Sequence, residues 1–295
     1  MPTEPIEHRV RQAALELAVL EWPGSEPAVL LVHATGFHAA CWLGVARELA
    51  GIRMLAPDLR GHGHSAKLAP YGWDTFGKDL ELLCEHFEME GWVGVGHSLG
   101  GHALVQAAAA RPQSFRSLGL VDPVILAPEA YRQLDTLAAA GEPHPASRRR
   151  GSFESATAMF ERFKDRAPYA RFRPEILRAY CERGLEPDPD RPGHYRLACP
   201  PEVEGAIYTE SRRTGLEGVL DQIDVPVEVL RARPRSPDAQ AFDFSTSPTW
   251  PALASKLRRG RDVPYPELTH FIPMEAPEVV AAHVRALREV PYPLP

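Results

Sequence analysis

The fold of this chain is decided by the stretch GVGHSLGGH at residues 94–102. The apolar run at 92–97 enters it and predicts a buried strand, and a strongly helical pattern leaves it. A serine between a strand and a helix is typical of a sharp turn that lifts the hydroxyl above a sheet. Small residues are needed at Gly96 and Gly100, because neighbouring backbone passes close to such a strained turn. Ser98 is therefore the candidate nucleophile, and the following helix terminus favours negative charge beside it.

On either side of this turn, short apolar runs alternate with helical patterns. Residues 8–22 partly alternate between apolar and polar side chains and predict one or two leading strands. Continuous apolar runs predict strands that are covered on both faces. The predicted strands are 28–33, 52–57, 92–97 and 117–122, and the predicted helices are 39–50, 74–88 and 99–111. This rhythm indicates a parallel sheet with helices on both faces.

The rhythm stops after residue 122 and resumes near residue 225. The segment between is helical and aromatic in pattern, so we expect a helical insertion at 123–225 within one sheet domain made of 1–122 and 226–295. The proline content rises at the same boundary: seven of the 30 prolines lie in 1–122 and 23 follow. Since proline fixes φ, we expect a stiff insertion. After it we predict a strand at 225–232, a helix at 250–259, a strand at 262–268 and a helix at 277–289.

The composition excludes several classes of protein. The net charge is −6 and the longest basic run is RRR at 148–150, so a nucleic-acid surface is not predicted. No apolar run is long enough for a membrane span, and the amino terminus lacks the pattern of a signal peptide. The four cysteines are widely separated, which favours free thiols and a cytoplasmic location. The sequence does not indicate an oligomeric state.

A serine hydroxyl needs an adjacent base to act as a nucleophile at neutral pH. Among the 12 histidines, His270 fits best, because LTHFIPMEAPE at 268–278 lies between the last predicted strand and the last helix. A loop there brings the imidazole over the serine, in the chain order serine, acid, histidine. His62 and His64 have the spacing of a metal pair, but no carboxylate or cysteine ligands accompany them, so no metal is predicted.

Three further stretches, together with the serine turn, resemble the α/β-hydrolase superfamily. They are LLVHATGFHAACW at 30–42, DLRGHGHS at 58–65 and HFIPMEAPE at 270–278. The likeness is to capped serine esterases and epoxide-hydrolase-like members, and it leaves only the insertion unmatched. It implies the α/β-hydrolase fold, a mostly parallel eight-stranded sheet flanked by helices, with a helical cap inserted after the sixth strand. One departure is His33-Ala34, where the family carries His-Gly.

The acid of this constellation has two candidates. Most members of the family carry it shortly after the seventh strand, where this chain reads RARPRSPDAQ at 231–240 and Asp238 comes later than expected. A minority take the acid from the end of the sixth strand, which corresponds here to Asp122 in GLVDP. One helix, a loop and a strand fit between Ser98 and that position. We therefore predict Asp122 as the acid and keep Asp238 as the alternative.

These residues imply acyl transfer through a Ser98–His270–Asp122 triad without a cofactor. The oxyanion needs two backbone N–H groups. One is expected from Leu99 and the other from Thr35, although the altered dipeptide leaves Gly36 and Phe37 open.

The surroundings of the triad give weaker expectations. Phe37, His97 and Phe160 are placed around the substrate, although His97 is expected to point away from the serine hydroxyl. An aromatic insertion acting as a lid favours a small ester with an apolar or aromatic group. Asp58 is expected to shape a turn, and the RRRGS stretch at 148–152 is expected to be an exposed, mobile loop.

The sequence therefore predicts a serine hydrolase acting on carboxylic esters. The same triad could instead cleave C–C bonds, lactones or cyanohydrins, or carry out perhydrolysis, because the fold does not determine the reaction. Epoxide hydrolase and dehalogenase activities are disfavoured, since they need aspartate where this chain has Ser98. A ligand-binding protein that has lost turnover is the remaining alternative.

Overall fold

The computed structural model describes residues 4–132, 144–210, 215–216, 218–235 and 243–293. Its centre is an eight-stranded sheet of order β1-β2-β4-β3-β5-β6-β10-β11. Only β2 runs antiparallel to its neighbours, so the predicted mostly parallel sheet is confirmed. The strands are β1 (Ile6–Gln12), β2 (Leu15–Trp22), β3 (Ser25–Val32), β4 (Ile52–Pro57), β5 (Trp92–His97), β6 (Phe115–Val121), β10 (Val227–Arg231) and β11 (Gly260–Pro264).

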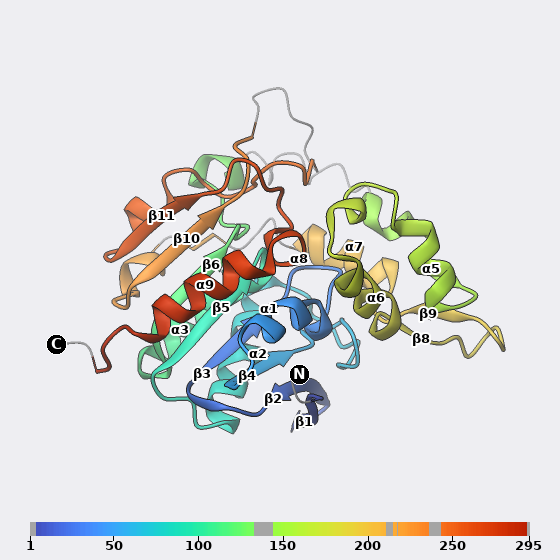
Figure 1. Ribbon diagram of the computed structural model, residues 1–295, viewed down its shortest axis with the longest axis horizontal. Helices are drawn as coiled ribbons and strands as arrows, with labels where there is room; N and C mark the ends of the chain where they lie inside the picture. Colours follow the sequence, from blue (N-terminus) through green and yellow to red (C-terminus); the bar gives the residue numbers. More distant parts are fainter. Residues whose placement is uncertain (1–3, 133–143, 211–214, 217, 236–242, 294–295) are drawn as a thin grey trace.

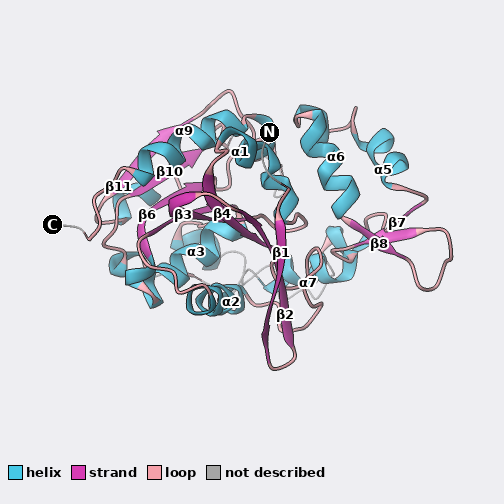
Figure 2. Ribbon diagram, turned by 60° about the horizontal axis from the view of Figure 1, so that its bottom comes forward, coloured by secondary structure: helices cyan, strands magenta, loops and turns pink. Residues whose placement is uncertain are grey.

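Helices cover both faces of the sheet, as Figure 2 shows. One face carries α2 (Trp73–His86) and α3 (Leu99–Ala110), and the other carries α1 (Leu43–Glu48) and α9 (Pro277–Arg288). Successive residues of a strand point to opposite faces, so Leu30 packs on the α2 and α3 side while Leu31 packs on the other. Both side chains are fully buried. The continuous apolar run therefore supplies two cores at once.

The segment between β6 and β10 forms a separate layer beyond one end of the sheet (Figure 1). Its helices include α5 (Ala156–Phe163), α6 (Pro174–Arg183) and α7 (Pro201–Glu210). It also contains a small antiparallel sheet, made of β7 (Ser152–Phe153), β8 (Leu185–Pro187) and β9 (Tyr195–Leu197). The insertion thus contains the helices that its pattern predicts, together with a small sheet that its pattern does not predict. Strands of two or three residues are too short to show an alternating pattern in the sequence.

Ion pairs and an aromatic cluster join this layer to the rest of the molecule. Arg171 of the layer pairs with Glu275 at 3.0 Å, and Arg183 lies 3.2 Å from Asp58. Glu275 ends the short helix α8 (Ile272–Glu275), which follows the last strand. Phe37 packs against aromatic side chains from both parts. The layer is thereby held over the loops that leave the carboxyl ends of the strands.

Two further predictions differ from the structure. The helix expected at 250–259 is only a 3-10 turn, Leu253–Lys256. The turn ends after Lys256 because Leu257 is extended, with φ −101° and ψ 137°. The strand expected at 262–268 is β11, which begins and ends earlier, at Gly260–Pro264.

Candidate active site

Ser98 occupies a strained turn between β5 and α3. Its φ of 57° and ψ of −118° lie in a region that residues other than glycine rarely adopt. The neighbouring glycines explain how the turn fits. A Cβ on Gly96 would lie 2.5 Å from the carbonyl oxygen of Gly100, and a Cβ on Gly100 would lie 2.2 Å from that of Val32. Close backbone approach thus makes both glycines necessary.

His270 lies between Ser98 and Asp122. Its Nε2 is 3.0 Å from Oγ of Ser98, and its Nδ1 is 2.7 Å from Oδ2 of Asp122. All three side chains are buried, with exposed fractions of 6% for Ser98, 2% for His270 and 0% for Asp122. In this arrangement Nδ1–H donates to the carboxylate, and Nε2 is free to accept the serine proton. The structure therefore brings the three predicted residues together in the order that nucleophilic catalysis needs.

Asp122 directly follows β6 and has a φ of 43°. Its Oδ1 accepts hydrogen bonds from the N–H of Ala232 at 3.0 Å, from Oγ of Ser247 at 2.5 Å and from Oγ1 of Thr249 at 3.3 Å. These donors fix the carboxylate so that Oδ2 faces His270. No sequence motif points to Ser247 and Thr249, because they lie far along the chain in a loop without a recognisable pattern. Asp238, the alternative acid, lies outside the described residues.

His97 supports the backbone of His270 rather than facing the substrate cavity. Its Nε2–H donates to the backbone carbonyl of His270 at 2.8 Å, and its side chain is buried. Burial, together with the nearby ring of His270, lowers the pKa of His97 well below its usual value, so it is neutral. His97 does not line the cavity beside Ser98, and neither does Phe160, which packs among the side chains of the insertion. Their tentative assignment to the substrate pocket is corrected.

Among the three residues of the loop after β3 that are candidates for an oxyanion donor, only Thr35 has an N–H without an acceptor among the described residues. The N–H of Gly36 donates to Nε2 of His62 at 3.0 Å, and that of Phe37 donates to the carbonyl of Ala34 at 3.2 Å. Within the described parts of the chain, the N–H of Thr35 has no such acceptor. Leu99 begins α3, so its N–H has no acceptor within the helix. The N–H groups of Thr35 and Leu99 are therefore without an acceptor in the described structure, and both remain candidates for binding an oxyanion.

Both ring nitrogens of His62 are engaged in hydrogen bonds to the backbone. It accepts from Gly36 through Nε2, and its Nδ1–H donates to the carbonyl of Arg60 at 2.9 Å. Among the residues that the structure describes, no group of histidine, cysteine and carboxylate side chains could hold a metal ion. Asp58 also lies away from the serine. It accepts from the N–H groups of Ala39 at 2.7 Å and His64 at 2.8 Å, which shapes the loops around it.

A cavity of about 130 Å³ opens beside Ser98 and His270. Thr35 and Phe37 line one side of it, and aromatic residues of the insertion line another. Those residues are Tyr169, Tyr180 and Tyr208, and burial raises the pKa of each, so they are neutral. The cavity is close in size to one of about 150 Å³ that holds a benzene molecule. The cavity therefore suits a small substrate group.

Arg149 and Glu204 also line this cavity. Nε of Arg149 is 2.8 Å from Oε2 of Glu204. The expectation that 148–152 is an exposed loop is therefore corrected for its central arginine, although Arg148 and Arg150 are exposed. An arginine triplet does not reveal which of its members turns inward, since that depends on contacts with α7, far along the chain.

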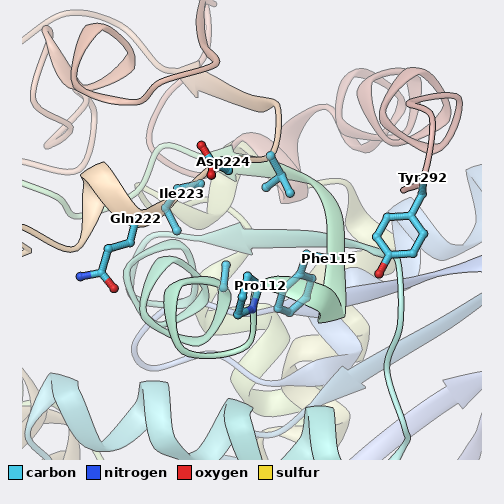
Figure 3. Close-up of a pocket in the computed structure, with 8 residues that line it drawn as sticks. Pro112, Phe115, Gln222, Ile223, Asp224 and Tyr292 are labelled. Carbon is cyan, nitrogen blue, oxygen red and sulfur yellow. The ribbon is translucent and has the colours of Figure 1, made fainter. Parts of the chain in front are cut away.

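A larger hollow of about 200 Å³ lies at the opposite end of the sheet. Figure 3 shows the ring of Tyr292 on one side of it, Ile223 on the other and Phe115 between them. Phe115 is the first residue of β6, whereas Ser98 and Asp122 follow the last residues of their strands. Ligands of open parallel sheets bind at the carboxyl ends of the strands. The cavity beside Ser98 is therefore the candidate active site.

Comparison with known proteins identifies the family. The model of the alpha/beta hydrolase family matches residues 29–283, which include the serine turn, Asp122 and His270 but not β1 and β2. The chain belongs to the α/β-hydrolase family. This membership confirms the fold predicted from the sequence motifs.

Several relatives of this α/β-hydrolase have names that describe an activity. It is 27% identical over 273 residues to Lipase LipV of Mycobacterium tuberculosis, covering 92% of this chain and 97% of that protein. It is 35% identical over 104 residues to a pimeloyl-[acyl-carrier protein] methyl ester esterase of Methylococcus capsulatus, which is 35% of this chain and 39% of that protein.

Solved structures resemble it over nearly the whole chain. The thioesterase domain from the curacin biosynthetic pathway superposes with a TM-score of 0.71 at 23% identity, covering 96% of this chain and 100% of that domain. At this identity the likeness shows the fold alone. None of the described helices combines the length and the apolar character that crossing a bilayer requires.

Proposed function

We propose that this α/β-hydrolase cleaves small carboxylic esters through an acyl-enzyme formed on Ser98. The observation that carries the proposal is the line of hydrogen bonds from Ser98 to His270 at 3.0 Å and from His270 to Asp122 at 2.7 Å. Relatives named lipase and esterase support ester hydrolysis as the general activity. In this proposal the protein is a capped serine esterase that needs no cofactor.

In the first step, Oγ of Ser98 bonds to the ester carbonyl carbon while Nε2 of His270 takes the serine proton. The tetrahedral intermediate collapses, the bond to the alcohol oxygen breaks, and His270 gives its proton to the leaving alcohol. Asp122 holds Nδ1–H of His270 throughout and stabilises the imidazolium while it exists. The fixed carboxylate described above suits this role, because it keeps the ring in one tautomer.

In the second step, water attacks the acyl carbon, His270 takes a proton from the water, and the bond to Ser98 breaks. The serine recovers its proton and the carboxylic acid leaves. Negative charge develops on the carbonyl oxygen in both steps, and the N–H groups of Thr35 and Leu99 are the proposed donors to it. Each such donor contributes roughly 3 kcal/mol of transition-state stabilisation in acyl-transfer enzymes.

The segment 123–225 serves as the cap in this proposal. It supplies the three tyrosines that wall the cavity opposite Ser98, so it excludes water and sets the shape of the acyl site. The aromatic walls suit a short carbon chain, and the cavity volume of about 130 Å³ sets the limit on its length.

A panel of p-nitrophenyl esters from acetate to octanoate tests the proposal, with lactones and epoxides assayed beside them. We expect the highest kcat/KM for the short acyl chains, because the cavity is small. The Ser98→Ala variant should lose at least about 10⁴-fold in kcat while remaining folded. Failure of the folded protein to hydrolyse any ester, or full activity of the variant, would contradict the proposal.

A further inference from the structure

The candidate active site contains a charged pair that the proposed chemistry does not use. Arg149 follows the 3-10 turn Pro145–Arg148, and Glu204 lies in α7. Nε of the arginine is 2.8 Å from Oε2 of the glutamate, and both residues line the cavity that contains Ser98 and His270. Burying charged groups is costly unless hydrogen bonds satisfy them, so the geometry of this pair matters.

The pair is close but poorly aligned. Neither Nε of Arg149 nor Oε2 of Glu204 has a hydrogen-bond partner within the described residues, although both atoms are buried. Arg60 and Asp79 in the same chain show what a structural pair looks like, with two parallel hydrogen bonds of 2.8 and 2.7 Å. The arrangement of Arg149 and Glu204 does not satisfy the guanidinium in this way.

Arg149 is the more accessible member of the pair. Its side chain keeps 24% of its surface exposed, whereas that of Glu204 keeps 9%. The glutamate is wedged against the loop after β3, since a Cβ on Gly36 would lie 2.9 Å from its Oε1. Both residues line the cavity, and the positive charge is the more exposed of the two.

The pKa shifts of the two side chains also favour Arg149 as the charged group. Burial raises the pKa of Glu204, and the charge of Arg149 only partly opposes this. Burial also disfavours the charge of Arg149, but the neighbouring carboxylate of Glu204 opposes this, and the pKa of the guanidinium is raised overall. Arg149 thus stays positive.

We propose that Arg149 binds a carboxylate of the substrate, which makes the substrate a small ester that also carries a free carboxylate. This inference rests on the proposed ester hydrolysis at Ser98. The planar guanidinium matches a carboxylate with two parallel hydrogen bonds. Because one cavity of about 130 Å³ holds both Ser98 and Arg149, only a few carbon atoms separate the ester from the carboxylate. Monoesters of short dicarboxylic acids have this chemistry.

The reaction on such a substrate is balanced by water alone. Ser98 bonds to the ester carbonyl carbon, the alcohol leaves with the proton from His270, and water then releases a dicarboxylic acid. The distal carboxylate keeps its bonds to Arg149 through both steps. Its role is to place the ester carbon beside the serine hydroxyl, so removal of the charge should affect KM more than kcat.

A matched pair of substrates tests this inference. Monomethyl glutarate carries the carboxylate, and methyl glutaramate replaces it with a neutral amide of the same shape. We expect the wild-type enzyme to have the higher kcat/KM for monomethyl glutarate. The Arg149→Met/Glu204→Gln variant removes both charges and leaves no buried charge alone, which preserves folding. The ratio of the two kcat/KM values should then fall about 30-fold, the size expected for losing a charge-assisted hydrogen bond.

Arg148→Met is the matched control, because it removes an exposed arginine next to Arg149 and should leave that ratio unchanged. A ratio unchanged in the double variant, or a wild-type preference for the amide, would overturn the inference. If the esters are hydrolysed in that case, the proposed function stands by itself.

Glutarate binding separates the two proposals further. It should raise the Tm of the wild-type protein but not that of the double variant, because a ligand bound only by the folded state stabilises it. If this difference is found in a protein that hydrolyses no ester, Arg149 binds carboxylates and the proposed hydrolysis is wrong. An equal shift in both proteins would overturn the role of Arg149.

Discussion

Replacing Asp122 by asparagine tests the acid of the triad, because asparagine has the same shape and no charge. Three donors point at Oδ1 of Asp122, from Ala232, Ser247 and Thr249. In the variant these donors hold the amide oxygen at that position, so the NH2 group must face His270. Nδ1 of His270 then becomes the acceptor, and the proton moves to Nε2. A protonated Nε2 cannot take the proton of Ser98.

The expected loss in kcat is about 10⁴-fold, the size found when the acid of a serine-protease triad is changed in this way. KM should change little, since Asp122 does not line the cavity. The assay is steady-state hydrolysis of a short p-nitrophenyl ester, with circular dichroism and Tm to establish that the variant is folded. Asp238→Asn, tested in parallel, should keep most of the activity. A folded Asp122→Asn enzyme with more than a tenth of the wild-type kcat would refute the reasoning, as would a larger loss in Asp238→Asn.

Two further predictions concern residues around the triad, and a third concerns the buried carboxylate of Asp58. His97→Phe removes the donor to the carbonyl of His270, so kcat should fall about tenfold and urea denaturation should show about 1 kcal/mol less stability. Ser247→Ala removes one of the three donors to the acid, and kcat should fall several-fold with KM unchanged. Arg183→Met leaves the buried carboxylate of Asp58 without its cation and should lower the free energy of unfolding by about 2–3 kcal/mol. Burial opposes the charge of Asp58, but Arg183, His38 and two backbone N–H groups lower the pKa of this carboxyl overall. The ionised carboxylate therefore stabilises the folded protein above about pH 4, and this stabilisation is lost as pH falls through the lowered pKa. The wild-type Tm should therefore drop in acid more steeply than that of Arg183→Met; parallel curves would contradict this role.

The regular half of the fold could be predicted closely from the sequence. The expected strands 52–57 and 92–97 coincide with β4 and β5. Both are short apolar runs bounded by turns. This is the pattern expected of a strand that is covered on both faces. The serine turn at Ser98 could also be predicted, because the strand, the glycines and the helix that define it are adjacent in the sequence.

Contacts between segments that are distant in the sequence could not be predicted from local patterns. The inward turn of Arg149 depends on its pairing with Glu204, and the donors around the acid come from a loop without a motif. The small sheet of the insertion is built from pairs of very short strands, whose stability comes from packing against the helices rather than from local propensity. The role of His97 likewise depends on a loop more than 170 residues away.

Covalent labelling of Ser98 tests the central claim most directly. A fluorophosphonate reacts with a serine only when a neighbouring base activates it. We predict that the folded protein takes up one equivalent of the probe and that peptide mass spectrometry places it on Ser98. Ser98→Ala should not be labelled, and His270→Ala should be labelled far more slowly. A folded wild-type protein without an adduct on Ser98, or one labelled at another serine, would contradict the account.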